Sequence, residues 1–275
     1  MSSTPEETIV KETTFLYGAN VRANGIRQHY LRFGGKGRVI VLVPGIISQA
    51  AIWAFVGDRL GQKNDVYVLD VRGRGLSESG AHLDYGLDAC ADDVIAFAGA
   101  LGLSDYTILG HSMGARIAIR AARRNDPALK QLILIDPPVS GPGRRPYPSP
   151  LEGVLKLLHA AQRGEAMQAL TAPGVKPWPQ DLMNLRAEWL HTCDERAAVV
   201  ASRSFHEDDI HADLPHITIP AALIIPEHGD VIRPEEEAEI KQLIPHIDVR
   251  HVADGGHQIQ VDNFEGLMRA LDGLM

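Results

Sequence analysis

Gly110-His111-Ser112-Met113-Gly114 joins the apolar run Tyr106–Leu109 to the helical pattern Met113–Arg124. In a turn between a strand and a helix, glycines two positions either side of a serine let the two elements approach closely. The turn lifts the serine hydroxyl above the carboxyl edge of the sheet, where open α/β sheets bind ligands. The following helix begins with free N–H groups and a positive dipole end, which suit a developing oxyanion. We therefore interpret Ser112 as a nucleophile for acyl transfer.

Apolar runs and helical patterns alternate on both sides of this turn. Strands covered on both faces are predicted at Val39–Val43, Val66–Asp70, Leu132–Ile135, Ala222–Ile225 and Val249–Val252. Helical spacing occurs at Ile52–Leu60, Asp88–Leu101, Pro234–Leu243 and Phe264–Leu274. Alternating residues at Thr14–Val21 and Ile26–Arg32, with Asn24-Gly25 between them, predict an antiparallel hairpin at a sheet edge. The whole pattern predicts an α/β fold with a mostly parallel, doubly wound sheet.

The alternation stops after residue 136. Residues 137–150 are rich in proline, and residues 151–215 show helical patches without a convincing strand. We therefore expect a helical cap at 137–215, inserted into a core made of 14–136 and 216–275. Residues 1–13 are predicted to be a flexible tail.

Two more loops follow predicted strands at the same edge of the sheet. Gly255-Gly256-His257 comes after the last strand, and this position distinguishes His257 from the other histidines as the general base. Pro44-Gly45-Ile46-Ile47 comes after the first buried strand, where Gly45 allows the Ile46 amide to face the nucleophile. The amides of Ile46 and Met113 are the predicted oxyanion hole.

Two aspartates compete to be the acid that orients the histidine. Asp230 follows the strand at 222–225, the usual place for this acid, and Asp136 follows the strand at 132–135. Either carboxylate could orient the imidazole and stabilise its charged form. Chain position alone favours Asp230. Asp254, beside His257, is interpreted as a solvated turn residue.

Composition restricts the partners of the chain. The 275 residues carry a formal net charge of −8, which gives no basic footprint for nucleic acid. Cys90 and Cys193 form no CxxC pattern, and no apolar run approaches the ~20 residues that span a bilayer. We expect a cytoplasmic protein without a nucleic-acid or membrane partner, and its oligomeric state is not predicted. His206 and His211 are five residues apart instead of the four of a zinc motif, so we expect no metal.

The motifs together resemble the α/β-hydrolase superfamily over residues 15–275. Five segments resemble, more narrowly, the N-formylmaleamate deformylase family of aerobic nicotinate degradation, whose relatives include the hydrolase acting on 2-(acetamidomethylene)succinate: Val21–Tyr30, Val68–Ser77, Gly110–Arg116, Asp136–Arg145 and Leu185–Cys193. The resemblance implies a serine hydrolase that needs no cofactor and releases formate from N-formylmaleamate. It also implies Asp136 as the acid instead of Asp230, because the family acid follows the same strand as Asp136.

A small anionic substrate requires a positive partner near the serine. The substrate-binding candidates are Arg144, Arg145, Arg186, Trp189 and His191. Arg116 lies one helical turn beyond Ser112 and is expected to brace the scaffold. Two alternatives stay open, because one fold hosts many chemistries. One is another serine hydrolase, such as a carboxylesterase, an amidase or a carbon–carbon bond hydrolase. The other is a non-catalytic ligand-binding protein.

Overall fold

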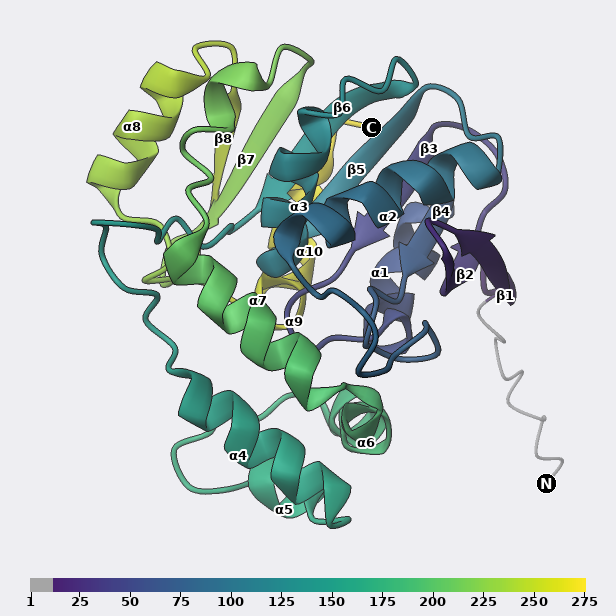
Figure 1. The fold of residues 1–275 in the computed structure, drawn as a ribbon, viewed down its shortest axis with the longest axis vertical. Coiled ribbons are helices and arrows are strands. Elements are labelled where there is room, and N and C mark those ends of the chain that lie inside the picture. Colours follow the sequence, from purple (N-terminus) through teal and green to yellow (C-terminus); the bar gives the residue numbers. More distant parts are fainter. Residues whose placement is uncertain (1–11) are drawn as a thin grey trace, which may run out of the picture.

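One eight-stranded sheet organises residues 12–275, which are the residues that the computed structural model describes (Figure 1). In sheet order its strands are β1 (Phe15–Ala23), β2 (Ile26–Phe33), β4 (Asp65–Leu69), β3 (Val39–Val43), β5 (Tyr106–His111), β6 (Leu129–Ile135), β7 (Ala221–Pro226) and β8 (Asp248–Val252). β1 and β2 form the predicted antiparallel hairpin at one edge. From β4 to β8 every neighbouring pair of strands is parallel. The predicted α/β class with a mostly parallel sheet is confirmed.

Helices cover both faces of this sheet (Figure 1). They are η1 (Ala50–Trp53), α1 (Ala54–Leu60), α2 (Leu87–Ala100), α3 (Met113–Ala122), η3 (Leu214–His216), α8 (Pro234–Leu243), α9 (Ile259–Asp262) and α10 (Phe264–Leu271). The short helix α9 was not expected from the sequence. It is separate from α10 because the Asn263 side chain accepts a hydrogen bond from the Gly266 amide and starts a new helix.

The predicted flexible tail comprises residues 1–13, of which residues 1–11 lie outside the described part of the chain. Thr13 is described, and its hydroxyl donates to the Asp58 carboxylate of α1 at 2.8 Å. Position 13 is therefore joined to the folded part of the chain.

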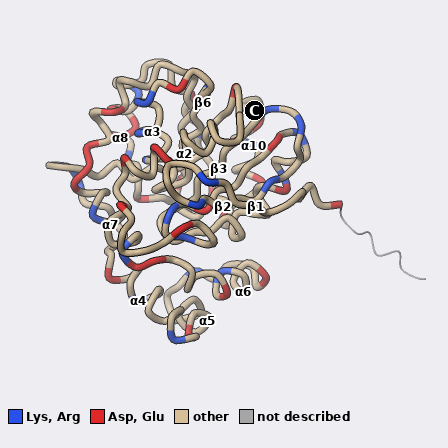
Figure 2. The backbone as a smooth tube through the Cα atoms, turned by 45° about the vertical axis from the view of Figure 1, so that its right-hand side comes forward, with Lys and Arg blue, Asp and Glu red and all other residues tan. Residues whose placement is uncertain are grey.

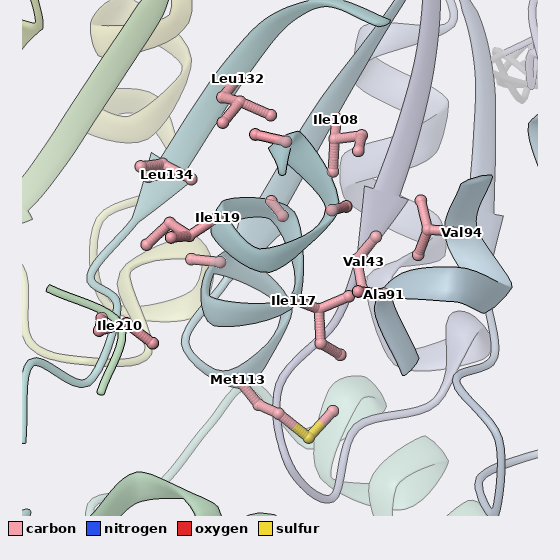
Figure 3. Packing of buried hydrophobic residues seen from close by; sticks show 14 of the residues in the cluster. Val43, Ala91, Val94, Ile108, Met113, Ile117, Ile119, Leu132, Leu134 and Ile210 are labelled. Atoms are coloured by element: carbon pink, nitrogen blue, oxygen red, sulfur yellow. The ribbon is translucent and has the colours of Figure 1, made fainter. Parts of the chain in front are cut away.

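The core lies on both faces of the central strands. In β3, Val43 belongs to the apolar cluster under α2 and α3, whereas the adjacent Leu42 belongs to the cluster under α1 and α10. Figure 3 shows the first cluster, where Val43 lies beside Ala91 of α2 and Ile117 of α3. Burial on both faces explains why the sequence of this strand is a continuous apolar run.

The chain between β6 and β7 is helical. Its elements are α4 (Leu151–Gln162), α5 (Ala166–Leu170), α6 (Gln180–Trp189), η2 (Leu190–Thr192) and α7 (Glu195–Glu207). They enclose a small apolar cluster of their own that includes Leu158, Leu190 and Ala198. In Figure 1, α7 runs diagonally between the sheet and the pair α4 and α5.

Two buried arginines attach α7 to the part of the molecule that holds the sheet. Arg116 of α3 donates to the carbonyl oxygens of Ser204 and Asp208, at the end of α7. Arg74 donates to the carbonyl oxygen of Ala197, near its start. Carbonyl groups at the C-terminal end of a helix carry partial negative charge, which suits the guanidinium of Arg116. The predicted bracing role of Arg116 is confirmed.

Charged residues of both signs are distributed around the molecule instead of occupying separate faces (Figure 2). Many of them pair with each other, as Arg124 does with Asp88 and Asp92. Among residues 12–275, no helix combines the length and the apolar character needed to cross a membrane.

Candidate active site

Ser112 occupies a strained turn between β5 and α3. Its φ of 53° and ψ of −117° are angles that residues with a side chain rarely adopt. The turn also needs both flanking glycines, because a Cβ on Gly110 would collide with the carbonyl of Gly114, and one on Gly114 with the carbonyl of Val43. The Ser112 amide donates to the Ile135 carbonyl at 2.9 Å. The serine is thereby held at the carboxyl ends of β5 and β6.

A line of hydrogen bonds joins Ser112, His257 and Asp136. His257 Nε2 lies 3.0 Å from Ser112 Oγ, and its Nδ1 lies 2.6 Å from Asp136 Oδ2. Burial raises the pKa of Asp136, and the hydrogen bond and charge of His257 oppose that rise. An Nδ1–H that donates to the carboxylate leaves Nε2 free to accept a proton. This arrangement can activate the serine hydroxyl.

Asp230 lies after β7 and has a different partner. Its exposed carboxylate pairs with Arg233 at 2.9 Å, and this hydrogen bond lowers the pKa of Asp230. The preceding residue, Gly229, instead packs against the buried acid, because a Cβ there would lie 3.3 Å from Asp136 Oδ2. The loop after β7 therefore covers Asp136 and leaves Asp230 at the surface.

His111, the residue before the serine, supports the loop of His257. Its Nε2 donates to the His257 carbonyl at 2.8 Å, and its ring centroid lies 5.0 Å from that of His257 and 5.1 Å from that of Trp53. Burial lowers the pKa of His111 to about 3, so its imidazole is neutral at physiological pH. His111 thus holds the loop without adding a positive charge beside His257.

The two predicted oxyanion-hole residues lie on segments that border Ser112. Met113 begins α3, so its N–H has no acceptor within the helix. Gly45 lies against the serine, since a Cβ there would be 3.5 Å from Ser112 Cβ. The carbonyl of Ile46 accepts a hydrogen bond from Arg74 Nε at 3.0 Å, which fixes the path of this loop.

A cavity of about 310 Å³ opens over Ser112 and His257. The helical segment between β6 and β7 contributes residues of several kinds to its wall, including Tyr147, Val154, Trp178, Arg186 and Phe205. Sequence reasoning did not identify Tyr147 or Trp178. Both lie in loops, where no periodicity indicates which side chains turn inward.

Arg186 of α6 is the predicted arginine that lines this cavity. Its guanidinium lies 4.3 Å from the ring centroid of Trp178. Within residues 12–275 no carboxylate is at ion-pair distance from it, and burial lowers the pKa of Arg186 to about 10. The side chain therefore stays charged at neutral pH. A half-buried cation without a counter-ion favours the binding of an anion.

Arg144 and Arg145 do not reach the cavity, contrary to the expectation from their place after Asp136. Arg144 makes two 2.7 Å hydrogen bonds with Glu239, and Arg145 pairs with Glu236 at 2.9 Å. Both glutamates belong to α8, which packs beside this loop. Each arginine is therefore held by a carboxylate of the protein.

Trp189 and His191 also lie outside the cavity of Ser112. Trp189 lines a separate, mostly apolar hollow together with Leu185 and His29. His191 borders a third hollow near the start of α7. Of the five predicted substrate-binding residues, the structure brings only Arg186 to the cavity of the serine.

One group of side chains in the described part of the chain has metal-ligand spacing. Glu227, His228 and Asp254 bring ligand atoms within 4.8 Å of one another, and all three residues are exposed. Asp254 has a φ of 55°, in agreement with its interpretation as a solvated turn residue. This exposed group is not part of the cavity that contains Ser112.

Sequence comparison relates the chain to known enzymes. Residues 40–267 match the alpha/beta hydrolase family. N-formylmaleamate deformylase from Pseudomonas putida is 54% identical over 261 residues, covering 94% of this chain and 96% of that protein. 2-(Acetamidomethylene)succinate hydrolase from Mesorhizobium japonicum is 22% identical over 251 residues, covering 88% of this chain and 89% of that protein.

Solved structures show the same relationship. The crystal structure of an N-formylmaleamic acid deformylase from Pseudomonas putida superposes with a TM-score of 0.88 at 48% identity, covering 93% of this chain and 100% of that one. E-2-(acetamidomethylene)succinate hydrolase superposes with a TM-score of 0.75 at 22% identity, covering 94% and 97%. The second likeness is one of fold alone.

Proposed function

The chain is a hydrolase of the alpha/beta hydrolase family, and from this premise we propose that it hydrolyses N-formylmaleamate to maleamate and formate. One observation carries the proposal: the serine–histidine pair and the unpaired Arg186 line the same cavity. A nucleophile and a cation in the wall of one cavity suit a substrate that has both an acyl group and a carboxylate. The name of the 54% identical relative supports this substrate and a place in nicotinate degradation.

In the proposed acylation, His257 Nε2 takes the proton of Ser112 Oγ as this oxygen attacks the formyl carbon. Asp136 stabilises the imidazolium through its hydrogen bond to Nδ1. The amides of Ile46 and Met113 stabilise the oxyanion. The C–N bond then breaks, the nitrogen receives the proton held by the imidazolium, and maleamate leaves.

In the proposed deacylation, His257 takes a proton from water as the water oxygen attacks the formyl-serine. The bond to Ser112 Oγ breaks as His257 returns the proton to the serine, and formic acid leaves and ionises to formate. During acylation Arg186 holds the carboxylate of the substrate until maleamate leaves, and the ring of Trp178 keeps the guanidinium in place. The proposed reaction uses no cofactor and no metal.

We also propose the division of the chain and its location. Residues 137–215 act as a cap over a core made of 14–136 and 216–275, because their wall residues complete the cavity of the serine. The enzyme works in the cytoplasm, where thiols stay reduced. The buried, unpaired thiols of Cys90 and Cys193 support this location.

Formate release from N-formylmaleamate tests the proposed function. We expect turnover of this anion and little activity on neutral p-nitrophenyl esters. Ser112→Ala should abolish both formate release and labelling by a fluorophosphonate. The matched control is Ser140→Ala, which removes a buried hydroxyl without a hydrogen-bond partner among the described residues and should leave both intact. Comparable rates on both substrates would indicate a general esterase, and a wild type that takes no label would not be a serine hydrolase.

A further inference from the structure

Tyr147 brings a second hydroxyl to the nitrogen that would accept the serine proton. Its hydroxyl lies 3.3 Å from His257 Nε2, the atom that also lies 3.0 Å from Ser112 Oγ. All three residues line the same cavity. The tyrosine belongs to the loop between β6 and α4, and its ring packs edge-on against Phe205 of α7 at 4.9 Å between centroids. The loop and α7 together hold the hydroxyl at the base.

The two hydroxyls can serve different steps, because a lone pair on nitrogen accepts only one proton. Ser112 Oγ gives its proton to Nε2 during attack and is afterwards bonded to the substrate carbon. Tyr147 then remains as the hydroxyl in contact with the imidazolium N–H. Burial raises the pKa of Tyr147 to about 12, although hydrogen bonding to Ser112 opposes the rise, so the phenol keeps its proton at neutral pH. It can therefore accept a proton from Nε2 while it donates its own.

The leaving group of the proposed reaction needs such a donor. An amide nitrogen expelled from carbon without a proton is a strongly basic anion, so its protonation must accompany the breaking of the C–N bond. A fluoride or an activated phenolate, in contrast, leaves as a stable anion. A proton-donating residue on the leaving-group side is therefore important for amides and of little use for activated substrates.

We propose that Tyr147 is a catalytic residue that relays the proton from His257 to the leaving nitrogen. The imidazolium Nε2–H passes to the phenol oxygen as the phenol O–H passes to the nitrogen. At the same time the C–N bond breaks and its electron pair goes to the nitrogen. His257 ends as a neutral imidazole and Tyr147 ends as a neutral phenol. This inference rests on the proposed function, since it concerns the leaving group of that reaction.

The substitution Tyr147→Phe separates the relay from a structural role. It keeps the ring that packs against Phe205 and removes only the hydroxyl. Because general acid catalysis contributes about 10²–10⁴-fold, we expect kcat for formate release to fall about 100-fold or more. The rate at which a fluorophosphonate labels Ser112 should change less than about 3-fold, because fluoride needs no proton to leave. KM for N-formylmaleamate should also stay nearly constant.

The matched control is Tyr106→Phe. It removes a hydroxyl that donates a 2.8 Å hydrogen bond to Asp126 and that does not line the cavity. It should leave both rates unchanged. Equal losses of formate release and labelling in Tyr147→Phe would overturn the relay and show that the tyrosine positions the base. Unchanged formate release would overturn it as well. A wild type that is labelled at Ser112 but releases no formate would instead overturn the proposed function, and the relay with it.

Discussion

The carboxyl ends of β6 and β7 are neighbours in the sheet, and each is followed by an aspartate, yet the two acids differ in burial and in their partners. Asp136 is fully buried and hydrogen-bonds His257, whereas Asp230 is exposed and pairs with Arg233. The backbone explains the difference: Asp136 has a φ of 45°, and its amide donates to the carbonyl of Ile224 in the next strand. Position after a strand thus brings a residue to the functional edge, but the path of the loop decides whether its side chain turns inward.

The same contrast extends to the other charged groups of the two regions. Arg145 lies on the side of α8 and pairs with Glu236, and Arg186 lies in the cavity without a counter-ion. Water screens the exposed pair of Asp230 and Arg233, so this pair adds little to stability. The buried groups act in a medium of low dielectric constant, where a charge or a hydrogen bond has a larger effect. Substitutions on the two sides should therefore have very different consequences.

The largest difference is expected between the two aspartates. Asp136→Asn should lower kcat for formate release about 10⁴-fold, because the amide no longer holds the histidine in the tautomer that accepts the serine proton. Asp230→Asn removes an exposed pair with Arg233 and a longer, 3.7 Å pair with Arg145, so kcat should stay within about 2-fold of the wild type. Both variants keep the size of the side chain. Loss of turnover in Asp230→Asn alone would show that the acid follows β7.

This contrast also marks the limit of what the sequence can tell about the site. The Gly-His-Ser-Met-Gly turn and the loop of His257 could be placed at one sheet edge, because glycines and strand order determine local geometry. The choice between Asp136 and Asp230 came from a resemblance, since no sequence rule describes how the loops cross. Arg144 was expected in the cleft because it follows Asp136. Glu239, which holds it, comes from a helix far along the chain.

A second and smaller difference is expected between the two arginines. Arg186→Leu should lower kcat/KM for N-formylmaleamate about 100-fold, mainly through KM, because a charge-assisted bond to the carboxylate inside the cavity is lost. Arg145→Leu should change KM less than about 3-fold, since this side chain binds Glu236 instead of the cavity. Steady-state kinetics on both variants would measure how far KM and kcat change in each. A similar rise of KM in both would mean that the carboxylate is bound nearer α8.

The fold was more predictable than the site, and its misses have physical causes. Central strands such as β3 are buried on both faces, so their apolar runs were unmistakable. The start of β6 was placed three residues late, at Leu132 instead of Leu129, because Lys130 and Gln131 interrupt the apolar run. These two polar residues lie where the strand emerges from the core, and Lys130 is exposed.

The smallest effect concerns stability, and it contrasts a buried histidine with an exposed one. The pKa of His111 is about 3 in the folded chain, against about 6.5 for an unfolded histidine. The unfolded state therefore binds a proton that the folded state excludes. This contribution to stability is fully present above pH 6.5 and is lost as the pH falls toward 3. Between pH 6.5 and pH 5 the free energy of unfolding should decrease by about 1.5 kcal/mol on account of His111.

Chemical denaturation at several pH values measures this slope, and two substitutions isolate its source. His111→Gln keeps an N–H donor for the His257 carbonyl but cannot titrate, so its unfolding free energy should fall less steeply below pH 6.5 than that of the wild type. His228→Gln changes an exposed histidine in the loop after β7, and its curve should run parallel to that of the wild type. If the curve of His111→Gln also ran parallel to that of the wild type, His111 would have to accept a proton in the folded state. The resulting cation would then lie next to the ring of His257. The slope therefore reports whether the ring of His111, next to that of His257, stays uncharged.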